Sequence, residues 1–136
     1  MKKIESYIHN TNGIEITVVP EYIESQTNAL VGIFFVWAYH IKIENKTEET
    51  VQLTHRYWKI IDEKGGIQEV KGEGVIGEQP IISPSGYFEY SSGVHLRYPS
   101  GVMMGHYIIK KANGESFQVK IPTFSLDIPG IKESIN

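Results

Sequence analysis

Hydrophobic and polar residues alternate along much of the chain, which is the pattern of half-buried β-strands. Near the start of the chain, Ile14, Ile16 and Val18 alternate with polar residues. This alternation predicts a short strand that stops before Pro20. The polar stretch at 21–28 that follows is interpreted as a loop.

A more apolar segment comes next. The run ALVGIFFVWAYHI at 29–41 has thirteen residues, which are too few to span a bilayer. It is rich in β-branched and aromatic residues, so we interpret it as a buried strand that extends from Val31. Toward its end, Tyr39, Ile41 and Ile43 fall on one face, and the polar residues between them fall on the other.

The middle of the chain predicts a further strand between two turns. A polar turn is expected at 45–49, a strand at 51–61, and a hairpin turn at Lys-Gly-Gly 64–66. Leu53 and Trp58 break strict alternation in this strand, which indicates a central or a bulged strand. Trp58 is therefore expected to lie in the core between two sheets.

The second half of the chain continues the same pattern. Strands are predicted at 87–90 and 103–111, followed by an Asn-Gly hairpin turn at 113–114 and a period-2 strand at 117–121 that Pro122 ends. No window of about eleven residues shows a helical period. About seven or eight short strands with dense turn signals predict an all-β sandwich or barrel.

Composition narrows the classes of function. The chain has 136 residues, 40% hydrophobic and 21% charged, which indicates one folded domain over 1–136. The net charge is −3 without a basic stripe, so no nucleic-acid partner is expected. There is no cysteine, which excludes disulfides and thiolate metal sites. No apolar signal-peptide core follows Met1, so we expect a cytoplasmic protein without a membrane partner.

Several stretches from Tyr39 onward form a specific set. They are YHIKIEN at 39–45, VQLTHRYWKIID at 51–62, VKGEGVIGEQPII at 70–82, YFEYSSG at 87–93 and YPSGVMMGHYIIKKANGESFQVKIPTFSLDIP at 98–129. Together they resemble the ApaG family. Their order and spacing extend the resemblance over residues 14–129. One departure is SPSG at 83–86. It carries an extra residue at the place where the family usually has Pro-Gly.

The resemblance implies an immunoglobulin- or fibronectin-III-like β-sandwich of about seven to nine antiparallel strands. Outside the matched residues we expect a short flexible N-terminus and a C-terminal tail at 130–136. The resemblance also implies a bacterial protein associated with cobalt and magnesium tolerance. Related eukaryotic domains look like protein-interaction modules. The family carries no established catalytic residues, so the resemblance assigns no catalytic residue and no cofactor to this chain.

A glycine motif is the most specific chemical signal in the sequence. The pattern G-x-G-x-x-G, found in dinucleotide-binding turns, is formed by Gly72, Gly74 and Gly77. A dinucleotide site needs a helix after the last glycine, but Pro80 disfavours one here. Glu73 and Glu78 would repel a phosphate. We therefore interpret the glycines as shaping a connection, and binding of another anion by backbone amides remains the alternative.

Other side chains offer weaker candidates. The five histidines form no metal-binding spacing, and a cross-strand site made by His95, His106 and an acid stays open; the family association would make cobalt its ligand. Arg56 shares a strand face with Trp58, where its guanidinium could stack or pair.

Two classes of function follow. The first is a non-enzymatic interaction module with a protein partner of unknown identity. The second is a small-ligand binder that uses the loop from Gly72 to Gly77 for a nucleotide, pyrophosphate or divalent metal. The sequence contains no plausible nucleophile, acid–base pair or metal cluster, which favours the first class. It leaves the oligomeric state open.

Overall fold

The computed structural model describes residues 5–28 and 32–128. Within these residues all regular structure is β, in nine strands. The strands are β1 (Tyr7–Thr11), β2 (Ile14–Asn28), β3 (Gly32–Asn45), β4 (Val51–Asp62), β5 (Ile67–Glu73), β6 (Ile81–Ile82), β7 (Tyr87–Leu96), β8 (Ser100–Lys111) and β9 (Ser116–Asp127). The expected start of a strand at Val31 and the expected tail at 130–136 lie outside the described residues.

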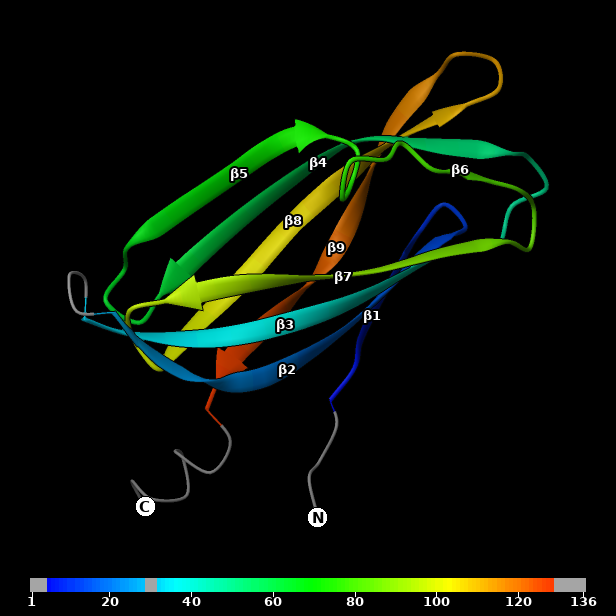
Figure 1. The fold of residues 1–136 in the computed structure, drawn as a ribbon. Helices are drawn as coiled ribbons and strands as arrows, with labels where there is room; N and C mark the ends of the chain where they lie inside the picture. The colour runs from blue at the N-terminus through cyan, green and yellow to red at the C-terminus, as the bar shows by residue number, and fades with distance from the viewer. Residues whose placement is uncertain (1–4, 29–31, 129–136) are drawn as a thin grey trace.

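The strands form two antiparallel sheets packed face to face (Figure 1). One sheet has the order β1-β2-β3-β7, and the other has the order β5-β4-β8-β9 with β6 paired to the start of β4. The predicted all-β sandwich of seven to nine strands is therefore confirmed. The finer likeness to immunoglobulin or fibronectin III domains stays a prediction.

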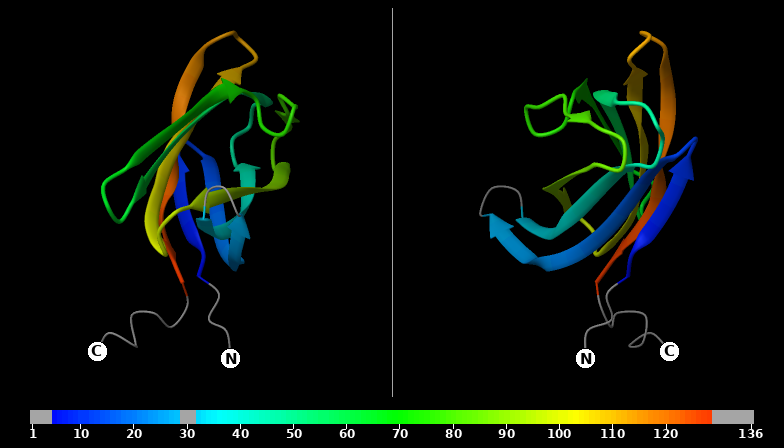
Figure 2. Two further views of the ribbon diagram at one scale, coloured as in Figure 1. Left: turned by 60° about the vertical axis from the view of Figure 1, so that its left-hand side comes forward. Right: turned by 90° about the vertical axis from the view of Figure 1, so that its right-hand side faces the viewer.

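One side of the sandwich is closed and the other is open. β1 and β2 contact β9, and the backbone N–H of Lys120 donates to Thr11 Oγ1 across this side. β7 and β5 are the border strands on the opposite side, as Figures 1 and 2 show. The open side therefore presents two sheet edges.

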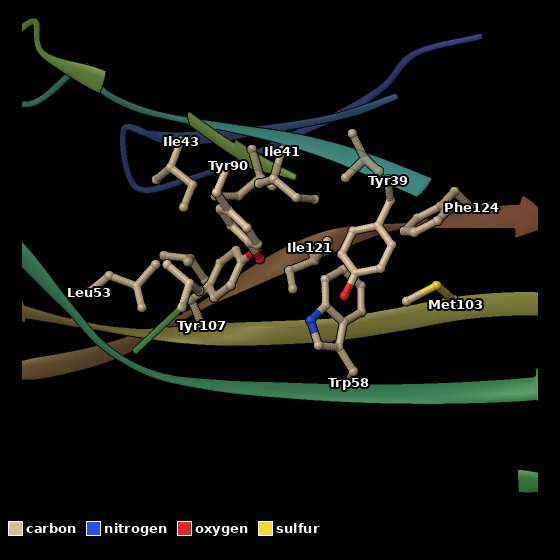
Figure 3. Close-up of a cluster of buried hydrophobic side chains, with 14 of the residues drawn as sticks. Tyr39, Ile41, Ile43, Leu53, Trp58, Tyr90, Met103, Tyr107, Ile121 and Phe124 are labelled. Carbon is tan, nitrogen blue, oxygen red and sulfur yellow. The ribbon is translucent and has the colours of Figure 1, made fainter. Parts of the chain in front are cut away.

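Aromatic and aliphatic side chains together fill the space between the sheets (Figure 3). Trp58 is 2% exposed, as predicted, and its ring lies 5.1 Å from the ring of Tyr39 on the other sheet. Phe124 packs edge-on against Trp58. Because these rings come from both sheets, their burial holds the two layers together.

The break in alternation within β4 has a structural cause. The pairing of β4 with β8 shifts between Leu53 and His55, which is a β-bulge. The bulge changes which residues face inward, so Leu53 and Trp58 are both buried although five positions separate them. The prediction of a central or bulged strand is confirmed, and β4 is both.

The expected loop at 21–28 is wrong, because β2 runs without interruption to Asn28. This stretch pairs with β3 from Glu21↔Ala38 to Asn28↔Gly32. The polar composition of 21–28 does not predict a strand. This stretch forms one because the apolar strand β3 lies beside it and pairs with it. Long-range pairing thus overrides local composition here.

The two prolines expected to end strands lie inside them. Pro20 pairs with Tyr39, beyond the last β1–β2 pair, Tyr7↔Val18. The bond from Lys46 N–H to the Gly13 carbonyl places the even-numbered residues of β2 toward β1. Proline's missing N–H therefore falls where β1 has ended. Pro122 lies at the β8–β9 register shift, where a bulge tolerates it.

Candidate functional site

The glycine motif forms the end of β5 and a tight turn after it. Val75 and Glu78 exchange two backbone hydrogen bonds, and the residues between them, Ile76 and Gly77, both have positive φ, at 43° and 78°. Positive φ at both central positions defines the hairpin turn that favours glycine. The motif is therefore followed by a turn and not by a helix.

Gly74 is required for a second reason. Its φ is +63°, and a Cβ at this position would lie 2.0 Å from the carbonyl oxygen of Glu78. A carbon and an oxygen that are not bonded cannot approach this closely, so no side chain can be accommodated at this position.

Gly72 has a different role, because it lies within β5 and not in the connection. A Cβ on Gly72 would lie 2.7 Å from Arg56 Nη1. The Arg56 guanidinium lies against Gly72, which has no side chain to obstruct it. It donates hydrogen bonds to the carbonyls of Glu73 and Gly74 at 3.1 and 3.0 Å. Arg56 does pair inside the fold, and it fixes the end of β5 against β4.

Part of the hydrogen-bonding capacity of the turn is already used. Gly74 N–H donates to the Thr54 carbonyl, and the N–H groups of Val75 and Glu78 bond across the turn. A phosphate cradle needs several N–H groups that converge on one point. Whether Gly72, Gly74 and Gly77 bind any anion stays a prediction.

Beside the turn, a shallow depression lies on the outer face of the five-stranded sheet. Tyr57 lines this depression: its hydroxyl donates to Glu69 Oε2 at 2.7 Å, and its ring stacks on His106 with centroids 5.0 Å apart. Lys71 Nζ lies 5.8 Å from the centre of the Tyr57 ring. Partial burial lowers the pKa of His106, which favours a neutral imidazole there.

The structure does not bring His95 and His106 together. His95 is on β7 beside the ring of Phe34, whereas His106 is on β8 in the other sheet. Within residues 5–28 and 32–128, no group of three or more His, Asp or Glu is arranged to hold a metal ion.

Two tyrosine hydroxyls are buried together in the core. The hydroxyls of Tyr90 and Tyr107 are hydrogen-bonded at 2.5 Å between the sheets, and Figure 3 shows them pointing toward each other. Burial raises the pKa of both groups above the ordinary value of 10.0. Both hydroxyls are therefore neutral at physiological pH and act as structural links between the sheets.

The β5 edge, meaning the side of β5 (Ile67–Glu73) that faces away from β4, is the most accessible backbone at this site. Six of its seven residues are exposed, and within the described part of the chain β5 pairs only with β4. Gly74 N–H donates to Thr54, and Asp62 N–H donates to Gly66. In an antiparallel pair this places even-numbered residues toward β4 and odd-numbered N–H and C=O groups outward.

Sequence reasoning missed the β5 edge. No strand was predicted at 67–73, because only Ile67 and Val70 are apolar there and the glycine motif drew the interpretation toward a connection. The signal that could have found it is the Gly65-Gly66 turn, since a hairpin turn after one strand implies a second strand behind it. The same reasoning applies to β1, which precedes the Asn12-Gly13 turn.

No helix in the described residues is long and apolar enough to cross a membrane.

The chain is similar to known proteins in sequence and in structure. The sequence profile of the ApaG domain matches residues 26–111. Protein ApaG of Methylocella silvestris is 50% identical over 126 residues, covering 93% of this chain and 96% of that protein. Protein ApaG of Parvibaculum lavamentivorans is 49% identical over 130 residues, covering 96% and 99%.

Solved structures agree with these relatives. An X-ray structure of a structural-genomics target is 38% identical with a TM-score of 0.84, covering 88% of this chain and 90% of that one. A crystal structure described as the ApaA protein of Bordetella pertussis is 37% identical with a TM-score of 0.79, covering 85% and 94%. The profile match, the sequence relatives and the shared fold together show that this chain belongs to the ApaG family.

Proposed function

We propose that this protein is a non-enzymatic interaction module that binds protein partners through the β5 edge. The observation that carries this proposal is the exposed β5 backbone, whose odd-numbered N–H and C=O groups point away from β4. A strand from a partner can continue a sheet at such an edge by forming the same hydrogen bonds.

The surroundings of the edge support this use. Arg56 and the turn at 74–78 fix one end of β5, and the hairpin turn closed by Asp62 and Gly66 fixes the other. A strand held at both ends loses little conformational freedom on binding, which favours affinity. Exposed Ile67 and Val70 add apolar surface along the same strand.

The remaining parts of the proposal concern the cell compartment and the physiological role. We place the protein in the cytoplasm of a bacterial cell and propose that any role in cobalt or magnesium tolerance acts through a protein partner. Direct binding of nucleotide, pyrophosphate or metal at the glycine turn is the competing hypothesis. Titration with ATP, pyrophosphate and Co²⁺ separates the two: a thermal shift abolished by Gly74→Ala in a folded variant would support the ligand binder.

Capture of partners from a lysate of the native cell tests the proposal, provided that variants identify the surface. Proline at Glu69 removes an N–H that points outward from β5 and leaves the backbone bonds to β4 intact. It also removes the side-chain bond from Tyr57 to Glu69. Glu89→Pro is the matched control, because Glu89 is an exposed acid on the β7 edge. The bond from Asn45 N–H to the Gly86 carbonyl places the N–H of Glu89 away from β3.

We expect Glu69→Pro to lose partners that wild type and Glu89→Pro both retain, with mass spectrometry identifying the captured proteins. Equal capture by all three versions would show that β5 is not the binding surface. Capture of nothing by any version would contradict the interaction module itself.

A further inference from the structure

We infer that the β5 edge binds the β5 edge of a second copy of this chain, forming a two-fold dimer with one continuous sheet. This inference rests on the proposed function, since it names one partner for that edge. It is carried by the self-complementarity of β5 in backbone pattern, charge and apolar surface.

The backbone pattern allows only some registers. Because odd-numbered groups point outward, an antiparallel β5–β5 pair can form hydrogen bonds only where odd residues face odd residues. A two-fold axis at Val70 meets this condition. It places Glu69 opposite the partner's Lys71 and Lys71 opposite the partner's Glu69, in two hydrogen-bonded pairs.

The charges select this register over its neighbours. On the outer face of β5 the order is Glu69, Lys71, Glu73, and the described residues contain no ion pair that involves any of them. With the axis at Val70, opposite charges face each other twice across the strands. Moving the axis to Glu69 or to Lys71 places like charges directly opposite, which destabilises a strand pair.

The side chain of Glu69 is held by one neighbour on its own sheet. Its Oε2 accepts a hydrogen bond from the hydroxyl of Tyr57 on β4, and it forms no ion pair within the described residues. An acid held in one rotamer loses less entropy when it pairs than a mobile acid does.

The inner face contributes apolar contact at the axis itself. Val70 is 39% exposed although it pairs with Trp58 of β4, because the border strand extends past the cover of the opposite sheet. In the proposed register Val70 faces the Val70 of the partner as a non-hydrogen-bonded pair, the closest kind of cross-strand pair. The contact covers apolar surface that is open in the monomer.

The size of the contact sets its strength. Two seven-residue strands bury less surface than a standard protein–protein interface. The dimer is therefore expected to be weak and to form as the protein concentration rises from micromolar to millimolar.

A charge-swap series measured by sedimentation equilibrium tests the pairing. The wild type should approach twice the 15.4 kDa chain mass as concentration rises. Glu69→Lys or Lys71→Glu alone should weaken association about tenfold or more, because each creates two like-charge contacts. The double variant Glu69→Lys/Lys71→Glu should restore it. Glu115→Lys and Lys110→Glu are exposed controls with the same changes in net charge and should associate like wild type.

A cysteine scan tests the register, since the chain contains no cysteine of its own. Under mild oxidation Val70→Cys should form a covalent dimer, because facing residues in a non-hydrogen-bonded pair lie within disulfide distance. Gln68→Cys should not, because its counterpart in the partner is displaced by four residues. Equal cross-linking at both positions would overturn the register.

The outcomes separate this inference from the proposed function. A wild type that stays monomeric to millimolar concentration, without cross-linking at Val70→Cys, overturns self-pairing. In that case, loss of lysate partners in Glu69→Pro would still support β5 as a surface for another protein. Dimer formation that the single charge reversals leave unchanged would place the contact elsewhere on the molecule.

Discussion

At the scale of single residues, the glycine motif works through space and backbone geometry. Gly72 leaves room for the Arg56 guanidinium, Gly74 allows the chain to pass the Glu78 carbonyl, and Gly77 supplies a positive φ in the turn. The sequence could show that no helix follows the motif. It could not show the contact of Gly72 with Arg56, because that contact depends on the pairing of β5 with β4.

The three roles predict different costs for the same substitution. Gly77→Ala should cost about 1–2 kcal/mol of unfolding free energy, because positive φ strains the new side chain but nothing lies within 4 Å. Gly74→Ala should cost clearly more, since its Cβ would also meet the Glu78 carbonyl at 2.0 Å. Urea denaturation of the two variants measures the difference, and equal costs would contradict the close approach at Gly74.

The buried tyrosine pair predicts a dependence of stability on alkaline pH. Burial raises the pKa of Tyr90 and Tyr107 above 10.0 in the folded protein, so the unfolded chain releases these protons first as pH rises. The folded state then binds more protons than the unfolded state, and the free energy of unfolding falls as pH rises above about 10. Below that pH the contribution is fully present.

Denaturant unfolding at several pH values from neutral to 11 measures this effect. The double variant Tyr90→Phe/Tyr107→Phe should show a shallower decline above pH 10 than wild type, because it lacks both titrating groups. An identical decline in the two proteins would show that other groups cause the alkaline loss of stability.

At the scale of elements, strands with strong alternation of their own were predicted well from the sequence. Strands that form only because a neighbouring strand pairs with them were predicted poorly. The strand at 51–61 and its bulge followed from Leu53 and Trp58, and the structure confirms both. The stretch 21–28 and β5 are polar or glycine-rich, and each becomes a strand because an adjacent apolar strand pairs with it. Local composition contains no information about such a partner.

The alternation of hydrogen-bond direction along β5 gives an element-scale prediction. Gln68 N–H faces β4, whereas Glu69 N–H faces outward. Gln68→Pro should therefore cost about 3 kcal/mol or more, and Glu69→Pro should cost much less because an edge strand tolerates proline there. Thermal unfolding of the two neighbouring variants makes the comparison, and a greater loss in Glu69→Pro would reverse the assigned directions.

At the scale of the whole molecule, the sandwich is closed where β1 and β2 meet β9 and open where β5 and β7 end their sheets. The sequence predicted the sandwich and the ApaG family but not which edges stay open, because that property depends on the order of strands in the sheets. The glycine motif lies next to the surface that we propose for binding. The surface that we propose for binding is the strand in front of the turn.

Residue-resolved hydrogen exchange of the β5 amides tests the central claim most directly. At low concentration the amides of Gln68 and Val70, bonded to β4, should exchange slowly, and those of Glu69 and Lys71 should exchange fast. At millimolar concentration, or with a captured partner bound, Glu69 and Lys71 should become protected while Glu89 on β7 stays fast. Fast exchange at Glu69 and Lys71 under every one of these conditions would contradict the claim that the β5 edge binds another strand.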